Sequence, residues 1–393
     1  MSTAQDIESI RGQLAARTGT CARDWFVLFK ARHGLQVAFE AIRDTMGDGS
    51  VVTQLLTCCT AVDPIIASGL HPRYAEISRR TAAIDPELLH LADDTRAVVL
   101  QHTYGIIDNE ESEAIAHISR VAGAVLVEDC AHCVGRMACD KNGLPVADVS
   151  VHSFGIEKML PTHFGGAVWV NPASPFASYT AELRARLESL PAAGAHLSAL
   201  SRTYRVTNAV LARLPHRLSS PLRGQLGRMG LFEPAVSERE RLGGVSHAPC
   251  RPPRCVTSAM SSALRTLDDN ERMRVVAVGM LRDGLSECAG IECLDGVAHG
   301  QAQPLVRFPV LLCDARQADS LIEAVLGHGF YATAWYRPLL CPGVLDAQVY
   351  EMPDEGSVSP VCADISSRVV ALPCDLPSDR IENLIDVIRN FCA

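Results

Sequence analysis

A buried strand, a helix and a second buried strand follow one another between residues 96 and 130, and this succession most constrains the fold. RAVVLQHTYG (96–105) is an apolar run that ends in a polar turn. NEESEAIAHISRVAG (109–123) carries apolar residues at helical spacing, and AVLVEDC (124–130) is apolar again. Strands joined through a helix are parallel neighbours. The pattern therefore predicts a parallel sheet covered by helices.

Two further apolar runs extend the predicted sheet. DVSVHSF (148–154) and GAVWVNP (166–172) are short, and each ends in a turn. With the first unit they predict a doubly wound α/β sheet. Ligands of such sheets bind at the carboxyl ends of the strands. We therefore expect Asp129, His102 and Ser153 to lie near one another.

The last third of the chain has a different pattern. It predicts one long helix over 257–284, a strand over 304–313, a helix over 315–329, a strand over 368–372 and a helix over 378–391. We therefore expect a large α/β domain over 1–250 and a small α+β domain over 251–393. Within the first, residues 187–255 are rich in Pro and Arg, which predicts an irregular insert of broken helices and loops with a surface or subunit-contact role.

Composition excludes several classes of protein. The chain has 393 residues, 48% of them hydrophobic, which excludes disorder as its main state. Its net charge of −9 argues against a general nucleic-acid binder. Its apolar runs are too short to cross a membrane, and the first residues lack the apolar core of a signal peptide. The 15 cysteines are scattered, so we expect reduced thiols, a cytoplasmic enzyme, and no nucleic-acid or membrane partner.

Two residues predict the chemistry. Asp129 ends a buried strand, where a carboxylate is costly unless it pairs with a cation or a donor. Lys158 lies in a turn shortly after another strand. Taken alone, the first is usually a turn residue and the second a solvated charge. Together at one pocket they suit pyridoxal 5'-phosphate (PLP), because the lysine binds its aldehyde and the carboxylate keeps its ring nitrogen protonated.

The two stretches VLVEDCAHCVGR (125–136) and ADVSVHSFGIEKMLPTHFGGAVWVNP (147–172) are long and ordered. They resemble the central motif of the DegT/DnrJ/StrS family of PLP-dependent sugar aminotransferases. The resemblance implies fold type I, a homodimer with the active site at the subunit boundary, and two small-molecule substrates. One is an amino donor, usually glutamate, and the other a keto sugar nucleotide or similar ketone.

The resemblance also assigns residue roles. It implies that Lys158 is catalytic and binds the cofactor's aldehyde, that Asp129 holds the pyridine nitrogen, that His132 lies near the ring and that Ser153 contacts the phosphate. The phosphate loop departs from the family pattern in FKARHGLQVAFEAI (29–42), where Arg32 and His33 fall at the usual contact positions. They either hold a phosphate or fill the pocket.

Cysteines raise other interpretations. The family's ring-stacking aromatic is replaced by Cys58 or Cys59, and this adjacent pair invites comparison with cysteine desulfurases. Those enzymes carry His before the lysine, where this chain has Glu157. Cys130-x-x-Cys133 suggests zinc or redox chemistry, but it stands without a second such pair, so we expect no metal site.

Three functions therefore stay open. The first is an aminotransferase. The second is a PLP enzyme of another reaction type such as a dehydratase, a branch that typically replaces the lysine with His. The third is a non-catalytic relative that binds PLP weakly.

Overall fold

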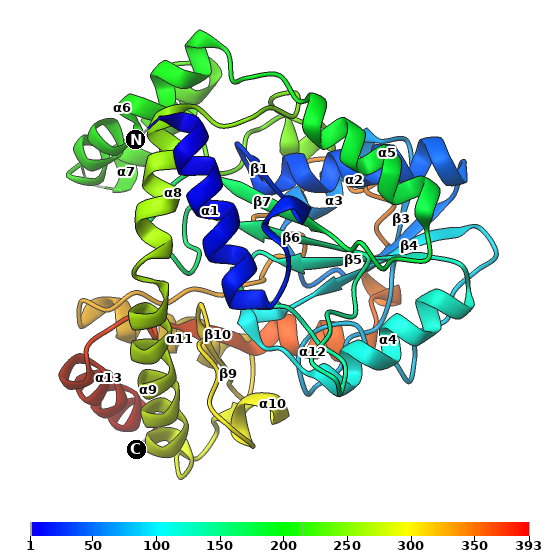
Figure 1. Ribbon diagram of the computed structural model, residues 1–393. Helices are drawn as coiled ribbons and strands as arrows, with labels where there is room; N and C mark the ends of the chain where they lie inside the picture. The colour runs from blue at the N-terminus through cyan, green and yellow to red at the C-terminus, as the bar shows by residue number, and fades with distance from the viewer. Residues whose placement is uncertain (1, 215, 393) are drawn as a thin grey trace.

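The protein is built on a seven-stranded sheet (Figure 1). The computed structural model describes residues 2–214 and 216–392. The strands run in the order β1 (Trp25–Leu28), β7 (Gly166–Val170), β6 (Val149–Ser153), β5 (Val125–Cys130), β4 (Thr95–Gln101), β2 (Ser50–Thr53) and β3 (His71–Tyr74). Six of these described strands run in one direction, and β7 runs in the opposite direction between β1 and β6. The predicted mostly parallel α/β sheet is confirmed.

Both faces of the sheet are covered, which explains why its central strands are apolar throughout. Val99 and Val127 pack on one face beneath α2 (Ala31–Met46), α3 (Cys59–Ala67) and α5 (Ala177–Ser189), whereas Val98 and Leu126 pack on the other face beneath α4 (Asn109–Val121). Figure 1 shows α1 (Thr3–Thr18) beside α8 (Arg254–Leu264) in front of the sheet. Their side chains pack near β1 and β7.

The predicted strand–helix–strand unit is confirmed in β4, α4 and β5. The carboxylate of Asp108 accepts hydrogen bonds from the amides of Glu110 and Glu111, which satisfies two free donors at the start of α4. After the helix, Gly123 takes a φ of +70°, a conformation that glycine adopts without strain. The chain therefore returns at once into β5, parallel to β4.

Helix α2 approaches the sheet closely at one glycine. A Cβ on Gly34 would meet Cγ2 of Val168 at 2.5 Å and Cγ1 of Val151 at 3.3 Å. The missing side chain therefore lets the first turns of α2 lie against β7 and β6. This contact places the start of α2 beside the ends of the strands that carry the predicted site residues.

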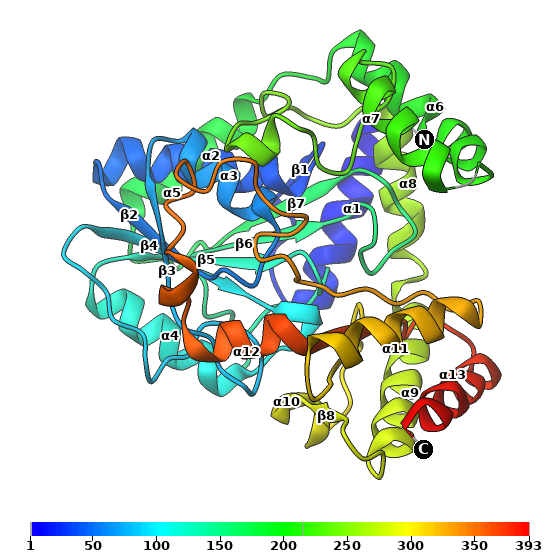
Figure 2. The same cartoon turned by 180° about the vertical axis from the view of Figure 1, so that it is seen from behind.

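A small second sheet, with strand order β10-β9-β8, lies beyond the large one. Figure 2 shows its helices gathered at one end of the molecule. The elements are α9 (Leu267–Leu285), β8 (Glu292–Cys293), α10 (Asp295–Ala298), β9 (Phe308–Leu311), α11 (Ala315–Gly327), α12 (Pro360–Arg368), β10 (Val369–Leu372) and α13 (Ser378–Cys392). The small α+β domain expected at the C-terminal end is confirmed, while its boundary at residue 250 stays a prediction.

The prediction of one long helix over 257–284 is wrong. The structure has two helices there, α8 and α9, and they separate at Thr266. Thr266 leaves helical geometry with a ψ of 5°, and its hydroxyl bonds to the carbonyl of Ala263 at 2.9 Å. Asp268 and Asp269 follow in the first turn of α9, where negative charge favours a helix start.

The Pro- and Arg-rich insert contains two helices, α6 (Ala195–Ala212) and α7 (His216–Arg228), followed by a long irregular segment. Four short 3₁₀ turns complete the described elements: η1 (Ala22–Asp24), η2 (Thr103–Gly105), η3 (Glu240–Leu242) and η4 (Glu355–Ser357). Within the described residues, every helix is too short or too polar to cross a membrane.

Candidate active site

A cavity of about 420 Å³ lies where the carboxyl ends of β4, β5 and β6 meet the start of α2. This volume is in the range of small-molecule sites. Six of the seven predicted site residues line the cavity: Arg32, Cys58, Asp129, His132, Ser153 and Lys158. The seventh, His33, is not among the lining residues.

Lys158 follows β6 in a turn that leads into the cavity. Its Nζ lies 5.6 Å from the ring centroid of Trp335. Burial lowers the pKa of Lys158, and Arg32 adds to this effect, whereas Cys58 and Asp129 oppose it. The environment therefore favours the neutral amine, the form that can attack a carbonyl carbon.

Asp129 is the penultimate residue of β5 and is buried. One of its oxygens, Oδ1, accepts a hydrogen bond of 2.9 Å from the amide of Ala131. Burial raises the pKa of Asp129, while this amide and the positive charge of Lys158 oppose the rise. A cationic group placed against the carboxylate would therefore favour its ionised form.

His132 is held by aromatic residues of two domains. Its ring stacks on Trp335 with the centroids 5.4 Å apart and the planes at 4°. Its Nδ1 accepts a hydrogen bond of 3.1 Å from the amide of Tyr104, and the Tyr336 hydroxyl lies 3.1 Å from Nε2. Burial, together with Lys158 and Arg307, lowers the pKa of His132, so the imidazole is neutral.

Cys58 begins helix α3 on the cavity wall, and Cys59 is buried behind it. The Cys58 sulfur lies 3.1 Å from the Thr60 hydroxyl. The hydrogen bond with Cys59 is the main factor that lowers the pKa of Cys58, and Arg32 and Lys158 also contribute. Of the two residues predicted to replace the ring-stacking aromatic, Cys58 is the one that faces the cavity.

The start of α2 carries two cations that are already paired. Lys30 forms an ion pair with Glu233, which also bonds to Nε2 of His247 at 2.9 Å. Arg32 pairs with Glu240 and donates to the carbonyl of Ala235 at 2.8 Å. Both glutamates are buried and come from the irregular segment of the insert.

His33 and Ser153 complete the predicted set. His33 is buried beside Phe29, and burial lowers its pKa to about 3, with Lys30 and Arg32 contributing, so it carries no charge near neutral pH. Ser153 ends β6 on the cavity wall, and its hydroxyl accepts a hydrogen bond of 3.2 Å from the amide of Gly155.

Sequence reasoning missed four residues around the cavity. Lys30 is one of only three lysines in the chain, and this rarity could have marked it as a candidate site residue. Glu233 and Glu240 lie in a segment without periodicity and cannot be placed from sequence. Trp335, in the motif WYRPLL (335–340), reaches the cavity from the small domain.

The residues fit PLP at its ring and aldehyde end. Lys158 offers a nucleophilic amine, and Asp129 offers a buried carboxylate in the wall of the same cavity. Ser153 and the amides at the start of α2 would hold the phosphate, because a helix N-terminus favours an anion. Glu233 pairs with Lys30, and Glu240 pairs with Arg32. These two carboxylates would compete with the phosphate for the two cations.

The architecture and this cavity define the class of protein to which the chain is similar. A crystal structure of an aminotransferase, TlmJ from Streptoalloteichus hindustanus, superposes with a TM-score of 0.70 at 23% identity, over 98% of this chain and 90% of the other. A crystal structure of 3-amino-5-hydroxybenzoic acid (AHBA) synthase gives 0.68 at 18% identity, over 98% and 90%. The predicted fold-type-I architecture is thereby confirmed.

The sequence comparison finds similarity to one family over part of the chain. Residues 26–185 match the model of the DegT/DnrJ/EryC1/StrS aminotransferase family. The chain is 28% identical over 204 residues to L-glutamine:2-deoxy-scyllo-inosose aminotransferase of Streptoalloteichus tenebrarius, which is 51% of this chain and 44% of that protein. It is 30% identical over 139 residues to GDP-perosamine synthase of Vibrio cholerae, 35% and 37% of the two chains.

These matches confirm the predicted family resemblance over the segment that holds all seven predicted site residues. The chain spans less than half the length of the two curated relatives that it matches.

Proposed function

We propose that the protein is a PLP-dependent aminotransferase. The observation that carries this proposal is the presence of Lys158 and Asp129 in one cavity at the strand ends, within the segment that matches an aminotransferase family. The acceptor is a keto sugar nucleotide or a similar cyclic ketone, since the similar proteins are named for an inosose and for a GDP-linked sugar. The donor is glutamate or its amide.

PLP, when bound, supplies the electron sink that an amino-group transfer requires. Lys158 would hold it through its amine, and in the neutral form that its lowered pKa favours it would accept and return the proton that the transfer moves. Asp129 stabilises positive charge on the pyridine nitrogen. The neutral His132, stacked on Trp335, forms part of the cavity wall.

The test is borohydride reduction of the PLP-loaded wild-type protein, followed by peptide mapping. We expect a single cofactor-modified peptide that contains Lys158, and a change in visible absorption when glutamate or glutamine is added. Lys158→Ala should abolish both signals, while Lys141→Ala, a change outside the cavity, should leave them intact. Modification at Lys30 or Lys141 instead, or at no lysine, would overturn the assignment.

One observation favours a second candidate, a relative that binds PLP weakly. Glu233 and Glu240 pair with Lys30 and Arg32 at the start of α2, where the phosphate would bind. If they limit binding, Glu240→Gln should lower the Kd for PLP about tenfold, roughly 1.4 kcal/mol. It should not change the Kd for pyridoxal, which has no phosphate.

The matched control is Glu238→Gln, an exposed carboxylate on the same segment. A micromolar or tighter Kd for PLP in the wild type, unchanged in Glu240→Gln, would reject the second candidate. Both Kd values come from titration of the cofactor's absorption band.

A further inference from the structure

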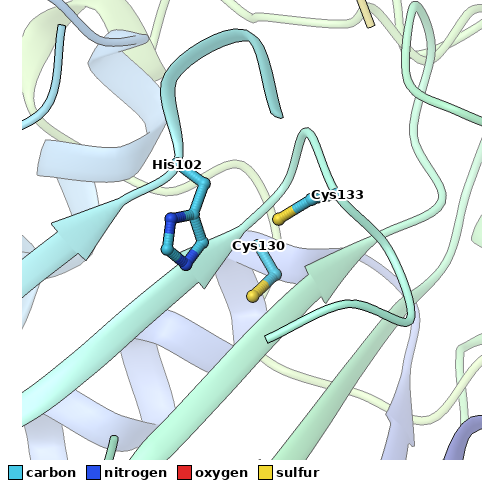
Figure 3. A group of neighbouring side chains, drawn as sticks. All are labelled: His102, Cys130 and Cys133. Atoms are coloured by element: carbon cyan, nitrogen blue, oxygen red, sulfur yellow. The ribbon is translucent and has the colours of Figure 1, made fainter. Parts of the chain in front are cut away.

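Three ligand-type side chains meet beside the cavity although the sequence separates them. A ring nitrogen of His102 and the sulfurs of Cys130 and Cys133 all lie within 4.8 Å of one another. All three residues are buried. Figure 3 shows the two sulfurs on the same side of the His102 ring.

The fold fixes this cluster through the backbone. His102 directly follows β4, and its amide donates to the carbonyl of Asp129 in β5 at 3.2 Å. Cys130 ends β5, and the turn that follows is closed by a bond of 3.1 Å from the amide of Cys133 to the carbonyl of Cys130. The three side chains therefore sit on the ends of two adjacent parallel strands.

The segment 129–133 presents two different faces. Asp129 and His132 line the cavity, whereas Cys130 and Cys133 are not among its lining residues and pack in the core beneath it. His102 borders both regions, since it also forms part of the cavity wall. A ligand bound by the two sulfurs would therefore lie directly behind the residues proposed to bind the cofactor.

The carboxylate of Glu128 contacts the ring of His102. Nε2 of His102 lies 2.7 Å from Oε1 of Glu128, which is fully buried. Glu128 is itself fixed by the amide of Ala138 at 2.6 Å and by the hydroxyl of Ser150. These contacts fix the position of the His102 ring beside the two sulfurs.

We propose that His102, Cys130 and Cys133 bind one Zn²⁺ ion per chain. Thiolate and imidazole are the ligands that zinc prefers, and tetrahedral Zn–S bonds of about 2.3 Å place two sulfurs about 3.8 Å apart. The three atoms need to close by only about 1 Å from the separation in the structure. Each thiol gives up its proton, so two thiolates balance the charge of the ion, and water takes the fourth position.

Sequence alone predicts no metal site, because one Cys-x-x-Cys pair offers only two ligands. The third ligand, His102, is 28 residues from Cys130 and is supplied by the neighbouring strand. The bound ion would fasten the ends of β4 and β5 together, and so fix Asp129 and His132. This inference does not depend on PLP binding.

The experiment uses the full-length protein, reduced with a phosphine and freed of metal by chelation. Titration with Co²⁺ should give one ion per chain, with the d–d bands of tetrahedral cobalt and a charge-transfer band of the intensity expected for two thiolates. These visible d–d bands lie at longer wavelength than the absorption of bound PLP. Added Zn²⁺ should displace the Co²⁺ at one equivalent.

Variants locate the site. Cys130→Ser and Cys133→Ser should each weaken Co²⁺ binding at least tenfold and lower the charge-transfer intensity. Cys139→Ser, a half-buried thiol six residues beyond Cys133, should bind as the wild type does. Circular dichroism checks that each variant is folded. The charge-transfer intensity of the wild type gives the number of thiolates bound to cobalt, so this measurement does not depend on the variants.

Three results would overturn the proposal: no stoichiometric Co²⁺ complex in the reduced wild type, a complex without thiolate charge transfer, or equal affinity in all three serine variants. A Cys130–Cys133 disulfide in protein purified without reductant, combined with no metal binding after reduction, would instead assign the pair to redox chemistry.

Discussion

Burial acts in opposite directions on the two residues that carry the proposed chemistry. It lowers the pKa of Lys158 and raises the pKa of Asp129, and in both cases it favours the neutral form. Their mutual attraction opposes both shifts, since each favours the charged form of the other. The ring nitrogen of PLP would supply the cation that Asp129 needs once Lys158 has become a neutral amine.

Replacement of Asp129 by Asn should remove the negative charge that attracts a cation in the cavity, while the protein stays folded. The amide has nearly the same shape as the carboxylate but cannot stabilise a protonated ring nitrogen. We expect turnover to fall by about a hundredfold or more, the scale of losing a main electrostatic contribution. Steady-state kinetics measure the fall, and thermal unfolding checks the fold.

The control for this variant is Asp140→Asn, a half-buried carboxylate outside the cavity, which should retain turnover. Unchanged turnover in Asp129→Asn would remove Asp129 from the proposed site. A variant that loses turnover because it is unfolded would be recognised by its circular dichroism.

At the scale of elements, the strand–helix–strand unit could be predicted almost to the residue. The apolar runs at 96–105 and 124–130 become β4 and β5 because parallel strands buried on both faces must be apolar throughout. The break between α8 and α9 could not be predicted, because apolar spacing continues across Thr266. Only the backbone geometry of that residue separates the helices.

The candidate site also contains some residues that could be predicted from the sequence and others that could not. Asp129, His132, Ser153 and Lys158 could be predicted because they belong to one ordered stretch that ends consecutive strands. Glu233 and Glu240 could not, because tertiary packing alone brings the end of the insert onto the start of α2. Sequence also separates the members of the proposed zinc site, which the parallel register of β4 and β5 joins.

The contact of α2 with the sheet gives an element-scale prediction. In Gly34→Ala the added methyl would meet Val168 at 2.5 Å, so the helix or the strand must shift. We expect a loss of about 1–3 kcal/mol in the free energy of unfolding, as for overpacked cores. Urea unfolding followed by circular dichroism measures this loss.

The matched control is Gly12→Ala in α1, where nothing lies within 4 Å of the new methyl. Alanine has the higher helix propensity, so this variant should be as stable as the wild type or up to about 1 kcal/mol more stable. If Gly34→Ala proved equally harmless, α2 would not be held against β7 as the structure has it.

At the scale of the whole molecule, the insert packs against the wall of the cavity. Tyr204 of α6 packs its ring against Phe164 and Phe232, with centroids 4.9 Å and 5.0 Å away, and Phe164 lines the cavity. The insert is thus packed on the loop that carries Lys158. From residue 189 to 232 it contains six arginines and no acidic residue.

The insert carries several large apolar residues that are exposed to solvent in a single chain. They are Val206, Val210, Leu218, Leu222, Met229 and Leu231, each at least 37% exposed. Large exposed apolar patches mark protein interfaces. We therefore propose that a second copy of the chain packs here, beside the active site, as the family resemblance implies for a symmetric homodimer.

A charge placed on the exposed face of α6 should separate this dimer. We expect Val206→Glu together with Val210→Glu to sediment as a monomer at a concentration where the wild type sediments as a dimer, since burial of two carboxylates in an apolar contact is unfavourable. Val121→Glu, at the end of α4 and 75% exposed, should leave the wild-type dimer intact. Because the insert packs on the loop of Lys158, the monomer should also bind PLP more weakly than the dimer. A wild-type protein that sediments as a monomer at every concentration while it binds PLP tightly would contradict both the dimer and its placement at the insert.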